Sequence, residues 1–232
     1  MSMTRQQFFT RGLAALAAAA ALPGSAAADL VERKSQWHGA AQLKQLMTRP
    51  ARYRQLYDIT NIHDGIFLNN IKNSLNGFEF GYGVPVRQVQ IAVALHGPAT
   101  VLNFNDTMWS KYRLAEFAGI AGSLRPEQAG KNPFFPATAQ AGHNDPNDLH
   151  SLDQDHSIQA LQRRGVAFLC CHTATEEQAR KLIQRLGLKA QPEEVVSDLL
   201  ANLHPGVLVV PSMVSTIAIL QTDGKFSYAT IA

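Results

Sequence analysis

Residues 166–171 read Val-Ala-Phe-Leu-Cys-Cys, an unbroken apolar run. Such a run is typical of a strand buried on both faces, as in a parallel sheet covered by helices. A helix is predicted directly after it, over residues 175–186, with Thr175 as its N-cap and acidic residues in its first turn. A buried strand that leads straight into a helix indicates an α/β fold.

The same alternation continues on both sides of this unit. Upstream, residues 86–95 (VRQVQIAVAL) predict a strand that enters the middle of a sheet, and a helix follows over residues 106–118. A short helix over 157–163 is predicted directly before the apolar strand. Downstream, the predicted elements are a helix over 192–203, a strand over 206–210, a helix over 211–220 and a strand over 226–231. Residues 86–232 are therefore predicted to form one α/β domain, with a mostly parallel sheet between two helical layers.

Two further segments flank or interrupt this domain. Residues 29–58 read as polar and helical, and residues 59–78 have helical periodicity, so residues 29–85 are predicted to form an N-terminal helical arm. Residues 119–155 are rich in Gly, Pro, Asn and Asp and form a loop-rich insertion. A loop of this length within a compact domain is usually either functional or mobile.

Residues 1–28 have the three parts of an export signal. Arg5 and Arg11 give a basic start, residues 13–22 are apolar, and Ala26 to Ala28 are small. The apolar run is shorter than the roughly 20 residues that span a bilayer, which disfavours the other interpretation, a membrane-anchoring helix. We expect cleavage after Ala28 and a periplasmic or secreted mature protein. Gln6 stands where a twin-arginine motif has its second arginine, so both the twin-arginine and the general secretory routes stay open.

Charge and hydropathy exclude two classes of partner. The chain has a net charge of +3, and the signal carries two basic residues and no acidic ones, which leaves the mature part at +1. Nucleic-acid binding, which needs a basic patch, is therefore not expected. The longest later apolar stretch, residues 207–220, is interrupted by Pro and Ser. No membrane association is expected once the signal is removed.

The two cysteines, Cys170 and Cys171, are neighbours in the sequence. Adjacent cysteines cannot form an unstrained disulfide, because the Cα–Cα separation of a disulfide is wider than one peptide step. Successive strand residues face opposite sides of a sheet, so only one of the two can lie near a site on a given face. Cys171 directly precedes a predicted helix, whose positive N-terminal end favours a thiolate.

Candidate site residues gather where the predicted strands end. In an open α/β sheet, ligands bind at the carboxyl ends of the strands. His96 and Gly97 follow one strand, Cys171 and His172 another, and Pro211 and Ser212 a third. Cys171 is the candidate nucleophile, with His96 and His172 as groups that add positive charge or move a proton. The alternative is that both cysteines are small apolar core residues.

Other polar groups are weaker candidates. Asn105, Asp106 and Lys111 belong to a polar and aromatic cluster that lines a pocket or caps a helix. The His- and Asp-rich stretch 143–156 has no recognised zinc or calcium spacing, and a solvated loop is the better interpretation. The chain also lacks a phosphate-binding glycine-rich loop, a G-x-S-x-G elbow and an H-E-x-x-H motif. No cofactor is predicted.

Three segments resemble the DsrE/DsrF-like family: VQIAVALHG at 89–97, RRGVAFLCCHTA at 163–174, and HPGVLVVPSMVSTIAILQTDGKFSYA at 204–229, in which Gln221 and Tyr228 match the family's ending. The resemblance implies a flavodoxin-like three-layer sandwich, a trimer or hexamer, and sulfur relay or sulfur oxidation with a persulfide on Cys171. The insertion at 119–155 and the doubled cysteine depart from the family pattern.

Three functional hypotheses follow. The first is an exported sulfur-handling protein, a persulfide carrier or sulfurtransferase-like protein, with Cys171 as the acceptor of a small sulfur species. The second is a non-catalytic module for small-ligand binding or assembly, in which residues 207–220 bury subunit contacts. The third is a metal-binding protein that uses His96, Cys171 and His172.

Overall fold

The computed structural model describes residues 30–230, which contain a five-stranded sheet in the order β4-β3-β2-β1-β5. All neighbouring strands are parallel. The strands are β1 (Tyr53–Ile59), β2 (Val89–Leu95), β3 (Ala167–Cys171), β4 (Leu208–Val210) and β5 (Ser227–Thr230). The predicted α/β, flavodoxin-like sandwich is confirmed. The proposed export signal at 1–28 lies outside the described residues.

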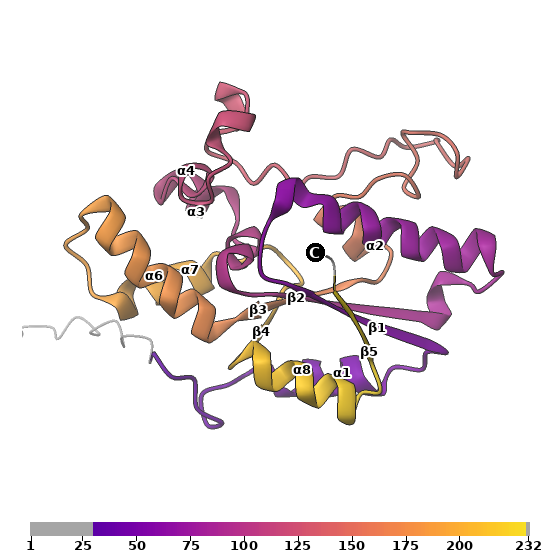
Figure 1. The fold of residues 1–232 in the computed structure, drawn as a ribbon, viewed down its shortest axis with the longest axis horizontal. Helices are drawn as coiled ribbons and strands as arrows, with labels where there is room; N and C mark the ends of the chain where they lie inside the picture. The colour runs from indigo at the N-terminus through magenta and orange to yellow at the C-terminus, as the bar shows by residue number, and fades with distance from the viewer. Residues whose placement is uncertain (1–29, 231–232) are drawn as a thin grey trace, which may run out of the picture.

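Helices cover both faces of the sheet (Figure 1). One face carries α1 (Ala40–Thr48) and α8 (Met213–Thr222). The other carries α2 (Ile66–Asn76), α5 (Ile158–Arg163), α6 (His172–Leu186) and α7 (Pro192–Ala201), with the short helices α3 (Asp106–Lys111) and α4 (Leu114–Phe117) beyond them. Within residues 30–230, no helix is both long and apolar enough to cross a membrane.

Each buried strand divides its side chains between two separate cores. Leu95 and Cys170 pack in the core under α2 and α6, whereas Ala94 and Cys171 pack in the core under α1 and α8. This is the alternation expected of a strand buried on both faces. The two cysteines therefore do face opposite layers.

Strand β1 corrects the prediction of a polar helical stretch over residues 29–58. Its sequence, YRQLYDI, lacks the solid apolar run of a buried parallel strand, yet it pairs with both β2 and β5. Its polar side chains are satisfied locally: Arg54 Nε donates to Gln90 Oε1, and Gln55 Oε1 accepts from Ser74 Oγ at 2.7 Å. Residues 29–85 thus contribute a central strand to the sheet as well as α1 and α2, and are not an arm outside it.

Two predicted helix boundaries are also wrong. Helix α6 begins at His172 with Cys171 as its N-cap, three residues before the predicted start. Thr175 lies inside the helix and donates its hydroxyl to the Cys171 carbonyl oxygen. The helix predicted over 106–118 is divided into α3 and α4 by Arg113, which adopts a left-handed φ of 50°.

The insertion over residues 119–155 consists of turns and short 3-10 helices and is fastened to the domain by buried polar groups. The Asn132 amide donates to the carbonyl oxygens of Leu102 and Phe104. Arg164, whose side chain is 4% exposed, donates to Asn76 Oδ1 and lies 3.4 Å from Asp153 Oδ1. The insertion therefore packs against the α2 side of the sheet.

The strand order reverses at β1. The chain passes from β1 through β2 and β3 to β4 with its connecting helices on the α2 face, and α8 then crosses the opposite face and places β5 on the far side of β1 (Figure 1). Open α/β sheets bind ligands outside the carboxyl ends of the strands at such a reversal. A ligand site is therefore expected outside the carboxyl ends of β1 and β5.

Candidate functional site at the carboxyl edge of the sheet

Three polar side chains from neighbouring strands meet at this reversal. His96, directly after β2, places Nε2 2.6 Å from Oδ1 of Asp58 in β1. Tyr228 in β5 donates its hydroxyl to the other carboxylate oxygen of Asp58. This hydrogen bond is the main cause of the raised pKa of Tyr228, because Asp58 favours the protonated phenol. Asp58 is the link between the other two residues.

The pairing with Asp58 leaves one nitrogen of His96 available. A carboxylate only accepts hydrogen bonds, so Nε2 carries the proton shared with Asp58. Nδ1 makes no hydrogen bond within residues 30–230 and is not among the buried unsatisfied atoms, so it is accessible to solvent. In the neutral ring, Nδ1 then carries a lone pair that accepts a proton.

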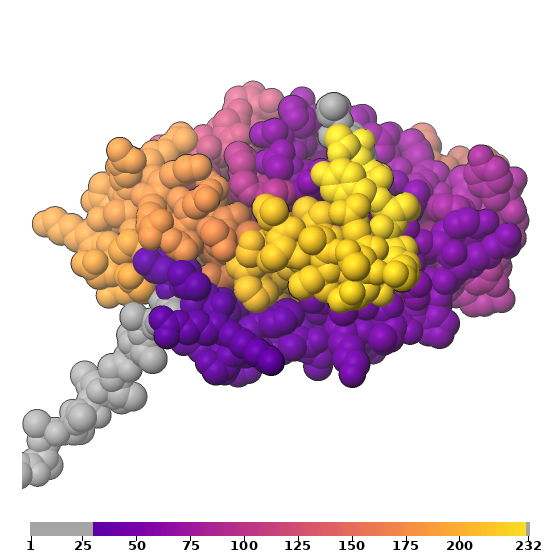
Figure 2. All heavy atoms as spheres, turned by 60° about the horizontal axis from the view of Figure 1, so that its bottom comes forward, coloured from indigo at the N-terminus to yellow at the C-terminus, as the bar shows by residue number. Residues whose placement is uncertain are grey.

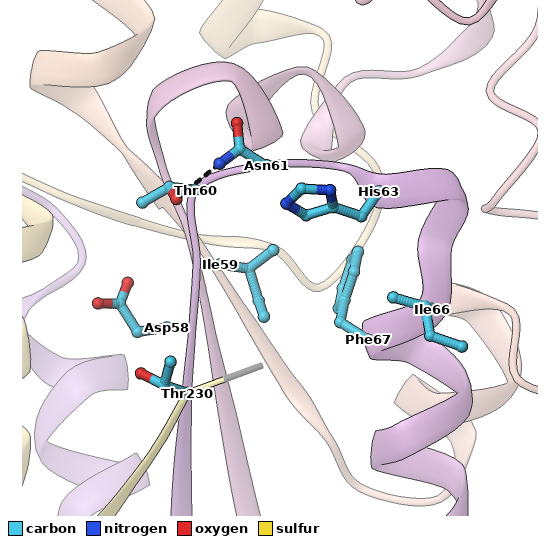
Figure 3. Close-up of a pocket in the computed structure, with 8 residues that line it drawn as sticks. All are labelled: Asp58, Ile59, Thr60, Asn61, His63, Ile66, Phe67 and Thr230. Atoms are coloured by element: carbon cyan, nitrogen blue, oxygen red, sulfur yellow. Dashed lines mark hydrogen bonds between the residues drawn. The ribbon is translucent and has the colours of Figure 1, made fainter. Parts of the chain in front are cut away.

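Two pockets meet at Asp58. The α8 pocket, about 330 Å³, is lined by Asp58, His96, Val214, Ile217, Gln221 and Tyr228. The loop pocket, about 230 Å³, is lined by Asp58, Ile59, Thr60, Asn61, His63, Ile66, Phe67 and Thr230 (Figure 3). In Figure 3, Asp58 and Thr230 lie on one side of the loop pocket, and His63, Ile66 and Phe67 lie on the other.

The turn between β1 and α2 that borders the loop pocket holds three successive residues in the left-handed region. The φ values are 40° for His63, 53° for Asp64 and 79° for Gly65. Residues other than glycine adopt this conformation at an energetic cost, and such strain gathers at functional sites. The turn therefore adds a second reason to regard this edge of the sheet as the functional site.

Cys171 lies on the same face as the α8 pocket, at the start of two helices. Its Sγ accepts the backbone N–H of Ala174 in α6 at 3.3 Å and that of Met213 in α8 at 3.2 Å. The residue is 4% exposed. Both N–H groups belong to first turns, where the helix carries partial positive charge, so both favour a negative sulfur.

Strand register places His96 beside Cys171. Leu95 pairs with Cys170, so His96 and Cys171 each follow by one residue on adjacent strands. Both follow residues of the α2-side core, so alternation directs both toward α8. Asp58, His96 and Cys171 thus come from three neighbouring strands on one face of the sheet.

His172, the third predicted catalytic residue, has a different environment. It is 4% exposed, and its Nδ1 has no hydrogen-bond partner within the described residues. Burial lowers the pKa of His172, against the opposing effect of Glu176. The imidazole is therefore neutral near pH 7 and supplies no positive charge to the thiol.

Three predicted pocket residues shape the turns around the site but line neither pocket. Gly97 adopts a φ of 54°, which only glycine takes readily. The Pro211 carbonyl accepts from the backbone N–H and the hydroxyl of Thr173, which ties the start of α6 to the turn before α8. Ser212 is the N-cap residue of α8, and its carbonyl accepts from Thr216.

The remaining predicted pocket residues lie away from this edge and make structural contacts. Asn105 caps α3 by accepting from the backbone N–H groups of Thr107 and Met108. Asp106 accepts from the backbone N–H of Asn132, and Lys111 pairs with Asp198 at 2.8 Å. The structure does not bring Asn105, Asp106 or Lys111 to either pocket.

Metal binding has no support from the side-chain geometry. Across residues 30–230, no three His, Cys, Asp or Glu side chains lie close enough to hold a metal ion. His96, Cys171 and His172 therefore do not form the metal site of the third hypothesis. In the His- and Asp-rich stretch, His143 Nδ1 pairs with Asp148 Oδ2 at 2.6 Å.

No sequence pattern singles out Asp58 as a site residue, and Tyr228 enters only through the family resemblance. Asp58 is the last polar residue of a strand whose sequence predicts a helix, so no local pattern places it at a strand end. Recognising Tyr53–Ile59 as a strand is the signal that places Asp58 beside His96.

No family model, no curated protein and no solved structure matches this chain.

Proposed function

We propose that the chain is an exported DsrE/DsrF-like protein that accepts a sulfane sulfur on Cys171, as a persulfide carrier or a sulfurtransferase-like enzyme. The observation that carries the proposal is the pair of backbone N–H groups, from Ala174 and Met213, that point at Cys171 Sγ. Two helix starts aimed at one sulfur favour a thiolate, which is the nucleophilic form of cysteine.

The His96–Asp58 pair supplies proton transfer. Asp58 orients the His96 ring through Nε2 and leaves Nδ1 open. His96 then accepts the proton of the Cys171 thiol, in the same arrangement by which other enzymes activate a nucleophile with an oriented base. Asp58 acts by positioning His96.

The sulfur-accepting step balances with thiosulfate as the donor. The Cys171 thiolate attacks the outer sulfur of thiosulfate, a bond forms between Sγ and that sulfur, and the sulfur–sulfur bond of thiosulfate breaks. Sulfite leaves with the electron pair, and Cys171 becomes a persulfide. Because Cys171 is 4% exposed, small inorganic donors fit this step better than a protein disulfide does.

A second function, assembly of subunits, is favoured by the outer face of α8. Val214 is 72% exposed and Ile219 is 39% exposed, and α8 with β5 occupies the centre of the surface in Figure 2. Exposed apolar side chains that cluster on one element are typical of contact surfaces. Analytical ultracentrifugation tests this function: a monomer at micromolar concentrations would argue against it.

Sulfite release tests the first function. The protein is mixed with thiosulfate under anaerobic conditions, and sulfite is measured over the first turnover. We expect one equivalent of sulfite per chain for the unmodified protein and none for Cys171→Ser. Equal sulfite release by both proteins, or no sulfite release from thiosulfate by either protein together with no gain of sulfur mass from polysulfide, would refute the proposal.

A further inference from the structure

The α8 pocket is larger and more apolar than transfer of a single sulfur atom requires. Its volume is about 330 Å³, whereas one water molecule occupies about 30 Å³ in the liquid. Val214 and Ile217 form an apolar wall, while His96, Gln221 and Tyr228 provide polar groups. A wall of this kind suits the carbon skeleton of an organic molecule better than it suits an inorganic anion.

Cys171 does not itself line the pocket, but two neighbouring elements connect them. Met213, whose N–H binds Sγ, directly precedes Val214 of the pocket wall. His96 lines the pocket and lies beside Cys171 in strand register. A persulfide carries its outer sulfur about 2 Å beyond Sγ, and Sγ lies 3.2 Å from the backbone nitrogen of Met213 in the first turn of α8, the turn that also contains Val214.

The polar groups of the pocket suit a ligand that gives up a proton. Both carboxylate oxygens of Asp58 are occupied, by His96 and Tyr228. His96 Nδ1 is then the group left to accept a proton from a ligand, and the Gln221 side chain stands at the same pocket. We propose that the α8 pocket binds a small organic thiol, which takes the sulfane sulfur from Cys171 while His96 accepts its proton.

This inference rests on the proposed function, because it describes how the sulfur on Cys171 is removed. The thiol transfers its proton to His96 Nδ1, and the resulting thiolate attacks the outer sulfur of the Cys171 persulfide. A bond forms between the thiolate sulfur and the outer sulfur, and the bond from Sγ to the outer sulfur breaks. The products are an organic persulfide and the Cys171 thiolate, to which His96 returns the proton, so no external oxidant or reductant is needed.

Binding to the α8 pocket is tested in the Cys171→Ala protein, which cannot carry sulfur at residue 171. Benzyl mercaptan is titrated into this protein and binding is followed by NMR. We expect saturable binding, weakened at least tenfold when Val214→Asp is added. Ile219→Asp is the matched control, because Ile219 is also exposed on α8 but does not line the pocket; binding should be unchanged. Absence of saturable binding, or equal weakening by both substitutions, would overturn the inference even if Cys171 carries sulfur.

Transfer is tested with protein loaded by polysulfide. The acceptors are benzyl mercaptan and sulfite, which has no proton to give up at alkaline pH. His96→Gln should lower the rate with benzyl mercaptan relative to the rate with sulfite by a factor of about 100, the usual contribution of a proton-transfer group. An unchanged ratio of the two rates would contradict the role of His96. A protein that never loads sulfur would instead refute the proposed function, and the binding titration would still decide the class of ligand.

Discussion

Cys170 and Cys171 are adjacent and both are buried, yet their sulfur atoms lie in different cores and have different hydrogen-bond partners. Cys170 is fully buried in the α2-side core, where burial raises the pKa of its thiol to about 12. Cys171 instead receives two backbone N–H groups at helix starts. One step along a strand therefore separates an inert thiol from one held as a hydrogen-bond acceptor.

The first prediction concerns Cys170. Cys170→Ala should lower the free energy of unfolding by about 1–2 kcal/mol, because it removes one buried sulfur atom from a packed core. Urea denaturation measures this loss. Sulfite release from thiosulfate should be retained, and a variant that folds but releases no sulfite would show that the wrong cysteine has been assigned.

The second prediction concerns the link between Asp58 and Tyr228. Asp58→Asn removes the negative charge that favours the protonated phenol, so the pKa of Tyr228 should fall toward its ordinary value. The phenolate absorbance, followed against pH, reports this change. Tyr228→Phe identifies the signal of Tyr228, and an identical titration of the unmodified and Asp58→Asn proteins would mean that the hydrogen bond is absent in solution.

At the level of single residues, sequence patterns single out Cys171 and His96 as candidates but not Asp58, which pairs with His96. Cys171 and His96 were visible because each follows an apolar strand. Asp58 was not, because its partners, His96 after β2 and Tyr228 in β5, are 38 and 170 positions away in the chain. No local pattern reports a contact between such distant residues.

Among the elements, β1 shows why polar content can hide a buried strand. Arg54 and Gln55 are half-buried and paired with Gln90 and Ser74, so this strand lies inside the sheet without an apolar run. The apolar strands β2 and β3, in contrast, were recognised to within three residues of their observed starts. The alternation of helices and strands was therefore predictable, but the position of β1 between β2 and β5 required the tertiary structure.

His204, which lies in the turn before β4, attaches the insertion over residues 119–155 to the domain. The His204 ring stacks on Phe135 with a centroid distance of 3.5 Å, and Nε2 accepts from the Asn132 amide. Burial lowers the pKa of His204 to about 4, with a smaller opposing effect of Asp106. His204 is therefore neutral in the folded protein near pH 7. The unfolded chain binds a proton at this histidine more tightly than the folded protein does.

The third prediction follows from this pKa. Because the folded pKa lies below the ordinary value near 6.5, the stability due to neutral His204 is complete above pH 6.5 and is lost as pH falls toward 4. His204→Gln lacks the titrating group and can still accept from Asn132. Between pH 7 and pH 4, the unmodified protein should lose about 3 kcal/mol more than His204→Gln does in urea denaturation. Parallel losses in the two proteins would exclude a neutral buried His204.

For the molecule as a whole, the order of the strands places the site. Because α8 crosses the face opposite to the other connections, β5 lies next to β1, and Tyr228 reaches Asp58. The family resemblance begins at residue 86 and does not include β1. It therefore predicts the three-layer sandwich but not the contact between Tyr228 in β5 and Asp58 in β1.

The fourth prediction concerns export. If residues 1–28 are an export signal, the protein recovered from the periplasm should begin at Asp29. Intact mass and N-terminal sequencing of that material give the answer. Replacing Arg5 and Arg11 with Glu should retain the precursor in the cytoplasm; recovery of a full-length chain that begins at Met1 from the periplasm would rule out cleavage.

The central claim is that Cys171 carries the transferred sulfur, and peptide mass spectrometry after treatment with thiosulfate or polysulfide tests it most directly. The unmodified protein and Cys170→Ala should each gain the mass of one sulfur atom on the peptide that contains residue 171, and Cys171→Ser should gain none. Added sulfur that persists in Cys171→Ser, or its absence from the unmodified protein with every donor, would contradict the account.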